Sequence, residues 1–142
     1  MELSAILALS MQRNASDIIL TVGRPPMFRI NGSLVPDTSA VLSSEDTEKL
    51  IFSVLNDSQV KEFNEKNELD LAVFFPDSGR FRVNVFRQQN FVGAAFRPIL
   101  SKIPTFESLA LSQTISNFCN MPSGLICVTG PTGSGKSTTL AA

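Results

Sequence analysis

The amino-acid sequence predicts an α+β domain, in which helices pack on an antiparallel sheet, followed by the beginning of an α/β domain. Three observations predict this class. Strand patterns come in hairpins, helical patterns lie between the hairpins, and a glycine-rich loop joins an apolar run to a helical run at the end of the chain. We assign residues 1–121 of the 142 to the first domain with its linker, and residues 122–142 to the start of the second.

The first part of the chain predicts a helix, a strand and a hairpin. Apolar residues recur at helical spacing from Leu3 to Met11, and the polar segment Asn14–Asp17 ends that helix. Residues 18–22 form a strand pattern that a Gly-Arg-Pro-Pro segment terminates. An Asn-Gly pair then joins two short strands over residues 27–35, which is a specific signal for a tight hairpin.

The middle of the chain predicts two helices and then three antiparallel strands. Ser43 opens a segment with capping-box spacing, and the polar residues 56–58 end the first helix and cap the second. Alternation of period two then predicts three strands, over residues 68–75, 80–87 and 91–97. Pro98 is expected to end the last of them, and short helical patterns follow up to Pro122.

The end of the chain carries a complete phosphate-binding motif. Residues 124–129 form a short apolar run, as expected for a strand buried on both faces of a parallel sheet. The pattern Gly-x-x-x-x-Gly-Lys-Ser follows from Gly130 to Ser137, and a helix should begin at Lys136. The residues expected to contact a nucleotide are Gly130, Thr132, Gly133, Ser134, Gly135, Lys136, Ser137 and Thr138.

This loop predicts binding of ATP with Mg²⁺. Its glycines let backbone N–H groups approach a polyphosphate, and the helix N-terminus adds partial positive charge. Lys136 is expected to reach the β- and γ-phosphates, and the Ser137 hydroxyl to ligate Mg²⁺. The two cysteines, Cys119 and Cys127, fit no metal-binding pattern, and we interpret them as small buried apolar residues.

Arginines gather on one face of the predicted sheet. Alternation places the apolar side chains of residues 80–87 on one side and Arg80 and Arg82 on the other, and Arg97 lies on the neighbouring strand. Guanidinium groups present planar donor forks that suit phosphate oxygens. Two interpretations stay open. The face is either solvated, with salt bridges to acids such as Asp70, or it approaches the γ-phosphate of a bound nucleotide.

Composition narrows the functional classes. The net charge is −1 and no basic stripe is present, so we expect no nucleic-acid partner, which disfavours a DNA-translocating ATPase. The chain has no histidine, which excludes histidine-based catalysis within it. No apolar run approaches the length of about 18 residues that spans a bilayer. We therefore expect a cytoplasmic protein, held at a membrane at most through its partners.

Several segments together resemble the PilT-like type IV pilus retraction ATPases of the secretion ATPase superfamily. They follow in order and with compatible spacing along essentially the whole chain, at Ala15–Leu20, Gly23–Pro26, Arg80–Asn84, Ala95–Arg97 and Gly124–Ala142. The P-loop alone specifies little, whereas the Arg-Phe-Arg-Val-Asn run with the Ala-Ser-Asp segment is far more specific. The early position of that segment resembles the retraction branch rather than the extension or type II secretion branches.

The resemblance implies a PAS-like first domain, a RecA-like second domain and a hexameric ring with ATP bound between the two domains. It implies catalytic roles for Arg82 and Arg97 near the γ-phosphate, and an inner-membrane pilus platform protein as partner. The family's acidic box, its second acidic (Walker B) motif and its histidine box would follow residue 142. The segment by itself is therefore not expected to hydrolyse ATP.

Two other functions fit the sequence. One is a pilus assembly or type II secretion ATPase of the same superfamily, which a tetracysteine metal site further along the protein would indicate. The other is a non-enzymatic, PAS-like interaction or oligomerisation domain, in which the P-loop is incidental. Nucleotide binding by the full-length protein distinguishes this last possibility from the ATPases.

Overall fold

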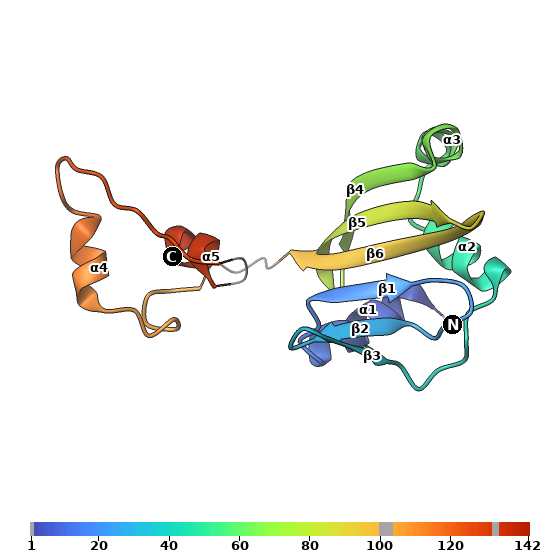
Figure 1. Cartoon of the computed structure of the whole chain (residues 1–142), viewed down its shortest axis with the longest axis horizontal. Coiled ribbons are helices and arrows are strands. Elements are labelled where there is room, and N and C mark those ends of the chain that lie inside the picture. The colour runs from blue at the N-terminus through green and yellow to red at the C-terminus, as the bar shows by residue number, and fades with distance from the viewer. Residues whose placement is uncertain (1, 100–103, 132–133) are drawn as a thin grey trace. The chain divides into compact units, whose positions relative to one another are not determined.

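The computed structural model of this chain describes residues 2–99, 104–131 and 134–142 (Figure 1). These residues form two compact units, Met1–Leu100 and Ser101–Ala142. The first unit contains a sheet, three helices and a hydrophobic core, and the second contains two short helices. The predicted domain boundary after Met121 lies inside the second unit and stays a prediction.

A six-stranded antiparallel sheet forms the first unit, with the strand order β3-β2-β1-β6-β5-β4. The strands are β1 (Asp17–Leu20), β2 (Met27–Ile30), β3 (Ser33–Pro36), β4 (Glu68–Phe75), β5 (Gly79–Gln88) and β6 (Phe91–Ile99). Pairing of β1 with β6 joins the blue N-terminal hairpin to the green and yellow three-stranded meander in Figure 1. This pairing brings residues from the two ends of the unit onto one sheet.

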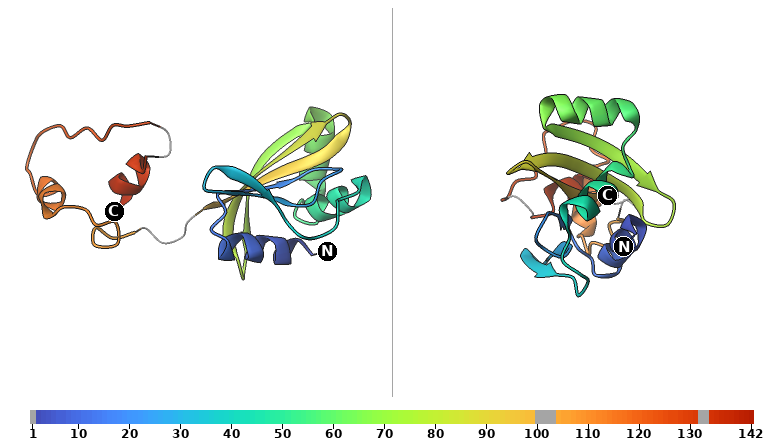
Figure 2. Two further views of the ribbon diagram at one scale, coloured as in Figure 1. Left: turned by 60° about the horizontal axis from the view of Figure 1, so that its bottom comes forward. Right: turned by 90° about the vertical axis from the view of Figure 1, so that its right-hand side faces the viewer.

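Three helices accompany the sheet, namely α1 (Leu3–Gln12), α2 (Ser44–Phe52) and α3 (Asp57–Lys66) (Figure 2). Helix α1 contacts β1, α2 contacts β6 and α3 contacts β4. Ser43 and Asp46 form a capping box at the start of α2, as the sequence predicted, and Asn56 with Gln59 forms a second one at α3. Each box satisfies backbone N–H groups that would otherwise lack a partner in the first helical turn.

One face of the sheet carries the core. Phe81, Val83 and Val85 of β5 are fully buried, whereas Arg80 and Arg82, which alternate with them, are exposed. The buried apolar residues of the helices meet this face, and they are Leu3, Ile6, Leu7, Leu50, Ile51 and Phe63. The predicted division of β5 into an apolar face and an arginine-bearing face is confirmed.

The residues at the ends of β2 and β6 test two predictions about where strands stop. Asn31 and Gly32 both have positive φ, 50° and 83°, which fits the tight hairpin predicted between β2 and β3. The prediction that Pro98 ends the last strand is wrong, because β6 continues to Ile99. The described pairing of β6 with β1 ends at Phe96, so Pro98 lies beyond the residues that pair with β1. A proline is tolerated there because its missing backbone N–H breaks no hydrogen bond to β1.

The second unit differs from two predictions. Its helices are α4 (Gln113–Phe118) and α5 (Lys136–Ala141), but residues 124–129 form no strand. Leu125 is 88% exposed, and Cys119 and Cys127 are exposed as well, so the predicted burial of the cysteines is wrong. A buried strand requires neighbours on both edges, and the described part of this unit contains no other strand to supply them.

None of the helices in the described ranges combines the length and apolarity that crossing a bilayer requires.

Hydrogen exchange should separate the two units clearly. Amides from Gly124 to Ala142 are expected to exchange almost at once in a dilute solution of the chain, because an unpaired apolar segment and a six-residue helix open at little cost. Amides of β5 and β6 serve as the internal reference and should be the slowest. Protection of residues 125–128 equal to that of β5 would show that the segment has acquired partner strands.

Candidate functional site

The two arginines predicted to be catalytic lie opposite each other on neighbouring strands. Arg82 of β5 pairs in register with Arg97 of β6. Directly opposed side chains in an antiparallel pair are close neighbours, and like charges at such positions repel. Both arginine side chains are largely exposed, so water screens part of this repulsion, and acidic groups on the same face reduce it further.

The carboxylate of Asp70 offsets the positive charge of Arg82. Nε of Arg82 lies 3.1 Å from both carboxylate oxygens of Asp70, and Nη2 also donates to Oδ2. This hydrogen bond from Arg82 holds the pKa of the Asp70 carboxyl below its ordinary value, and the same contact raises the pKa of Arg82. The salt bridge considered in the sequence interpretation is therefore formed.

The carboxylate of Asp17 offsets the positive charge of Arg97. Nε of Arg97 lies 2.9 Å from Asp17 Oδ1, Nη2 lies 2.8 Å from the same atom, and Arg29 Nε lies 3.1 Å from Asp17 Oδ2. Partial burial acts to raise the pKa of Asp17. The hydrogen bonds from Arg97 and Ser16 and the charges of Arg97 and Arg29 outweigh it, so the pKa lies below the ordinary value.

These groups surround a shallow hollow on the sheet face opposite the core. Arg82, Arg97, Asp17 and Asp70 line it. Arg80 lies two pairs away from Arg82 along β5, opposite Ile99, and has no ion pair among residues 2–99. The arrangement presents paired guanidinium groups to solvent, which can bind an oxyanion by charge-assisted hydrogen bonds.

The phosphate-binding motif is exposed in the second unit. Helix α5 begins at Lys136 as predicted, after Gly135 in the left-handed conformation with φ 86°. Nζ of Lys136 donates to the carbonyl oxygens of Gly130 and Pro131 at 2.8 and 2.7 Å. Gly130 has φ 154°, a backbone conformation that residues with a side chain rarely adopt, so the loop favours glycine there.

The remaining predicted contacts of this motif are placed only in part. Ser137 and Thr138 lie in the first turn of α5 with exposed side chains. Thr132 and Gly133 lie outside the described residues. An exposed hydroxyl directly after the lysine suits the predicted role of Ser137 toward Mg²⁺.

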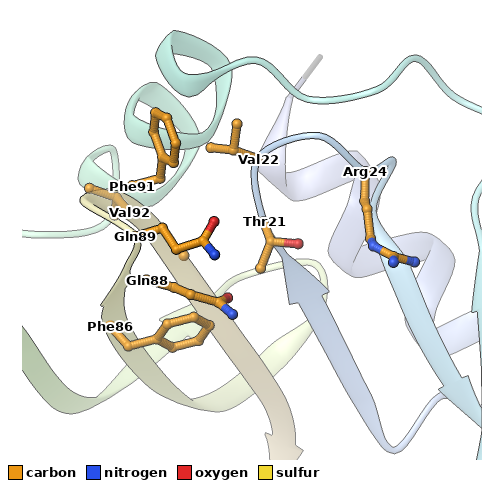
Figure 3. Close-up of a pocket in the computed structure, with 9 residues that line it drawn as sticks. Thr21, Val22, Arg24, Phe86, Gln88, Gln89, Phe91 and Val92 are labelled. Atoms are coloured by element: carbon orange, nitrogen blue, oxygen red, sulfur yellow. The ribbon is translucent and has the colours of Figure 1, made fainter.

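A second hollow lies at the other end of the sheet and contains none of the predicted site residues. It is lined by the turn between β5 and β6 and by the loop after β1. Figure 3 shows the amides of Gln88 and Gln89 pointing toward Thr21, whereas Arg24 lies apart from them. The ring of Phe86 occupies the space that a side chain at Gly93 would need.

The carboxylate partners were the residues that the sequence analysis largely missed. The sequence pattern offers Asp70 only as one example of a salt-bridge partner, and it places Asp17 in the polar segment that ends the first helix. The strand order shows why: Asp17 and Arg97 are 80 residues apart and meet only because β1 pairs with β6. The alternation within β1 and β6 was the available signal, but it does not say which strands pair.

Low pH should lower the free energy of unfolding of the first unit, because it protonates the carboxylate of Asp17. A carboxyl whose pKa is lowered on folding adds stability above its unfolded pKa of about 3.9, and this stability is lost as the pH falls through the lower folded pKa. Asp17→Asn should therefore lower the free energy of unfolding at pH 7 by about 1–3 kcal/mol and flatten its dependence on pH below about 5. Urea titrations at several pH values measure both.

Asp77→Asn is the matched control, since Asp77 is exposed in the turn before β5 and has no ion pair within residues 2–99. Equal effects of the two substitutions at pH 7 would show that the bridge to Arg29 and Arg97 adds no stability.

The comparison with protein families matches residues 95–142 to the type II/IV secretion system proteins. Two proteins of Pseudomonas aeruginosa are similar over the whole chain. The type IV pilus retraction ATPase PilT is 43% identical, and the type IV pilus ATPase PilU is 39% identical. A crystal structure of the pilus retraction motor PilT with bound ADP superposes with a TM-score of 0.82 at 38% identity, over 99% of this chain.

The chain spans about two fifths of the length of these relatives, namely 41% of PilT, 37% of PilU and 41% of the PilT chain in the crystal structure. The α+β architecture, with its antiparallel sheet and helices, matches the N-terminal domain of these proteins. The predicted α+β class of the first domain is thereby confirmed, whereas the first strand predicted for the second domain is not formed.

Proposed function

Because this chain is a member of the PilT-like group of type II/IV secretion proteins, we propose that it forms part of an ATP-driven motor that retracts type IV pili. The observation that carries the proposal is the pair of opposed guanidiniums, Arg82 and Arg97, in the same chain as a complete phosphate-binding loop. A loop that binds phosphates and cations that stabilise the γ-phosphate are the two parts that phosphoryl transfer requires.

Each residue has a defined task in this proposal. Lys136 exchanges the neutral carbonyl oxygens of Gly130 and Pro131 for anionic phosphate oxygens, which are stronger acceptors. The hydroxyl of Ser137 would hold Mg²⁺, which would supply positive charge to offset that of the β- and γ-phosphates. Arg82 and Arg97 stabilise the charge that develops as the γ-phosphate leaves. The catalytic glutamate is assigned to the rest of the protein.

We further propose that the full-length protein works as a hexameric ring. In this proposal the PAS-like first domain and a RecA-like second domain bind ATP between them, and the protein engages a pilus platform protein at the inner membrane. The sequence relationship to PilT and PilU supports these proposals. Nucleotide that binds one arrangement of the domains more tightly than another would drive their rotation.

A pilus assembly or secretion ATPase is the second candidate, because the matching family model covers type II and type IV secretion proteins together. A retraction motor shortens pili in living cells, so loss of the gene should leave cells piliated but unable to twitch. An assembly motor should leave them without pili. Surface pilus counts and twitching-zone diameters therefore decide between the two candidates.

The isolated 142-residue chain should not turn over ATP. It lacks the acidic motifs that orient water and metal in phosphoryl transfer, whereas the full-length protein has them under this proposal. Phosphate release in the presence of Mg²⁺ measures both proteins side by side. Turnover by the short chain at the rate of the full-length protein, and lost on Lys136→Ala, would contradict the assignment.

A further inference from the structure

The two arginines of the candidate site are held in the same way. Arg82 uses Nε and Nη2 to bind Asp70, and Arg97 uses Nε and Nη2 to bind Asp17. The hydrogen bonds and ion pairs described within residues 2–99 include none from Nη1 of either arginine. Both guanidiniums are thus bound along one edge and open at their ends.

This geometry leaves a defined set of donors. A guanidinium carries five N–H groups in one plane, one on Nε and two on each Nη. The carboxylate occupies the edge formed by Nε and one N–H of Nη2. The other N–H groups lie at the end of the side chain, where Nη1 and Nη2 form a second fork of the kind that binds phosphate oxygens in pairs.

We propose that Asp70 is a positioning residue, which fixes the guanidinium of Arg82 so that its terminal fork meets the γ-phosphate. The inference rests on the function proposed above. Asp70 and a phosphate would use different edges of the guanidinium, so the carboxylate orients Arg82 without competing for the nucleotide. Asp17 binds the same edge of the Arg97 guanidinium, so the arrangement occurs twice on this face of the sheet.

A contribution to folding stability does not explain the ion pair between Arg82 and Asp70. The side chains of Arg82 and Asp70 are 64% and 43% exposed, and ion pairs this exposed contribute about 0–1 kcal/mol to folding. A long exposed arginine has several rotatable bonds, and ordering it when ligand binds costs free energy. A partner that orders it beforehand therefore makes the bound geometry more accessible, which raises turnover rather than stability.

The test uses the full-length protein and the variants Asp70→Asn, Arg82→Ala and the double variant. We expect Asp70→Asn to lower kcat by about fivefold, with unchanged ADP affinity and unchanged Tm. In the Arg82→Ala background the same substitution should cause no further loss, because Asp70 acts only through Arg82. Glu68→Gln is the matched control, since Glu68 lies on the same face of β4 and accepts a hydrogen bond from Asn84 but forms no ion pair with a guanidinium within residues 2–99.

The outcomes separate the inference from the function on which it rests. Unchanged or raised kcat in Asp70→Asn, beside a loss in Arg82→Ala, would overturn the positioning role and leave the proposed function standing. An equal loss from Asp70→Asn in both backgrounds, or from Glu68→Gln, would assign the effect to charge or folding instead. Wild-type turnover in Arg82→Ala would remove the proposed role of Arg82 itself, and the role of Asp70 with it.

Discussion

Replacement of Phe81 by alanine should lower the free energy of unfolding of the first unit by about 3–5 kcal/mol. Phe81 is fully buried near the start of β5, and its ring packs edge-on against Phe75 with the ring centroids 5.8 Å apart. The substitution removes the apolar contacts of a whole ring and leaves a cavity that β4 and β6, the neighbours of β5, close only in part. Urea denaturation followed by circular dichroism measures the change.

Phe74→Ala is the matched control for this prediction. Phe74 lies on the neighbouring strand β4, but it points away from the core and is 69% exposed. Truncation of its ring should change the free energy of unfolding by no more than about 0.5 kcal/mol. Similar losses in the two variants would mean that the core does not lie on the face of the sheet that carries Phe81.

Replacement of Lys136 by alanine should reduce ATP turnover of the full-length protein by at least about 10²-fold. The ammonium of Lys136 lies over its own loop, held by carbonyl oxygens of Gly130 and Pro131. The motif assigns this ammonium to the β- and γ-phosphates of a bound nucleotide. Removal of this cation leaves the charge of the β- and γ-phosphates without its main protein partner in the loop.

Lys61→Ala controls for the general loss of a lysine, because Lys61 is exposed on α3 in the other unit. Phosphate release and binding of a fluorescent ADP analogue measure turnover and affinity in both variants. Wild-type turnover in Lys136→Ala would contradict the proposed role of the motif in ATP hydrolysis.

Local patterns were sufficient to predict most of the first unit. Ser43 with Asp46, Asn31 with Gly32, and the alternation around Phe81 each depend on residues close in sequence, and all three formed as expected. The guanidinium face was predictable for the same reason, since alternation alone separates Arg82 from Phe81. Local patterns could not predict the pairing of β1 with β6, so they could not predict the contact between Asp17 and Arg97 either.

The region from Gly124 onward shows a different limit. Its apolar run has the composition of a strand buried in a parallel sheet, and such a strand requires neighbouring strands on both edges. Without neighbours in the described part of the chain, Leu125 and Cys127 are exposed and the run forms no strand. Local composition states which structure a segment prefers, whereas tertiary partners decide whether that structure forms.

The central claim is that Arg82 and Arg97 act on the γ-phosphate, and kinetics of the full-length protein test it most directly. Turnover and ADP affinity should be compared in the wild type, Arg82→Ala, Arg97→Ala and the double variant. We predict that Arg82→Ala lowers turnover by at least about tenfold, or about 1.4 kcal/mol, while ADP affinity changes little because ADP lacks the γ-phosphate. Unchanged turnover in both single variants and in the double variant would contradict the account and leave these arginines as solvated residues of an open sheet face.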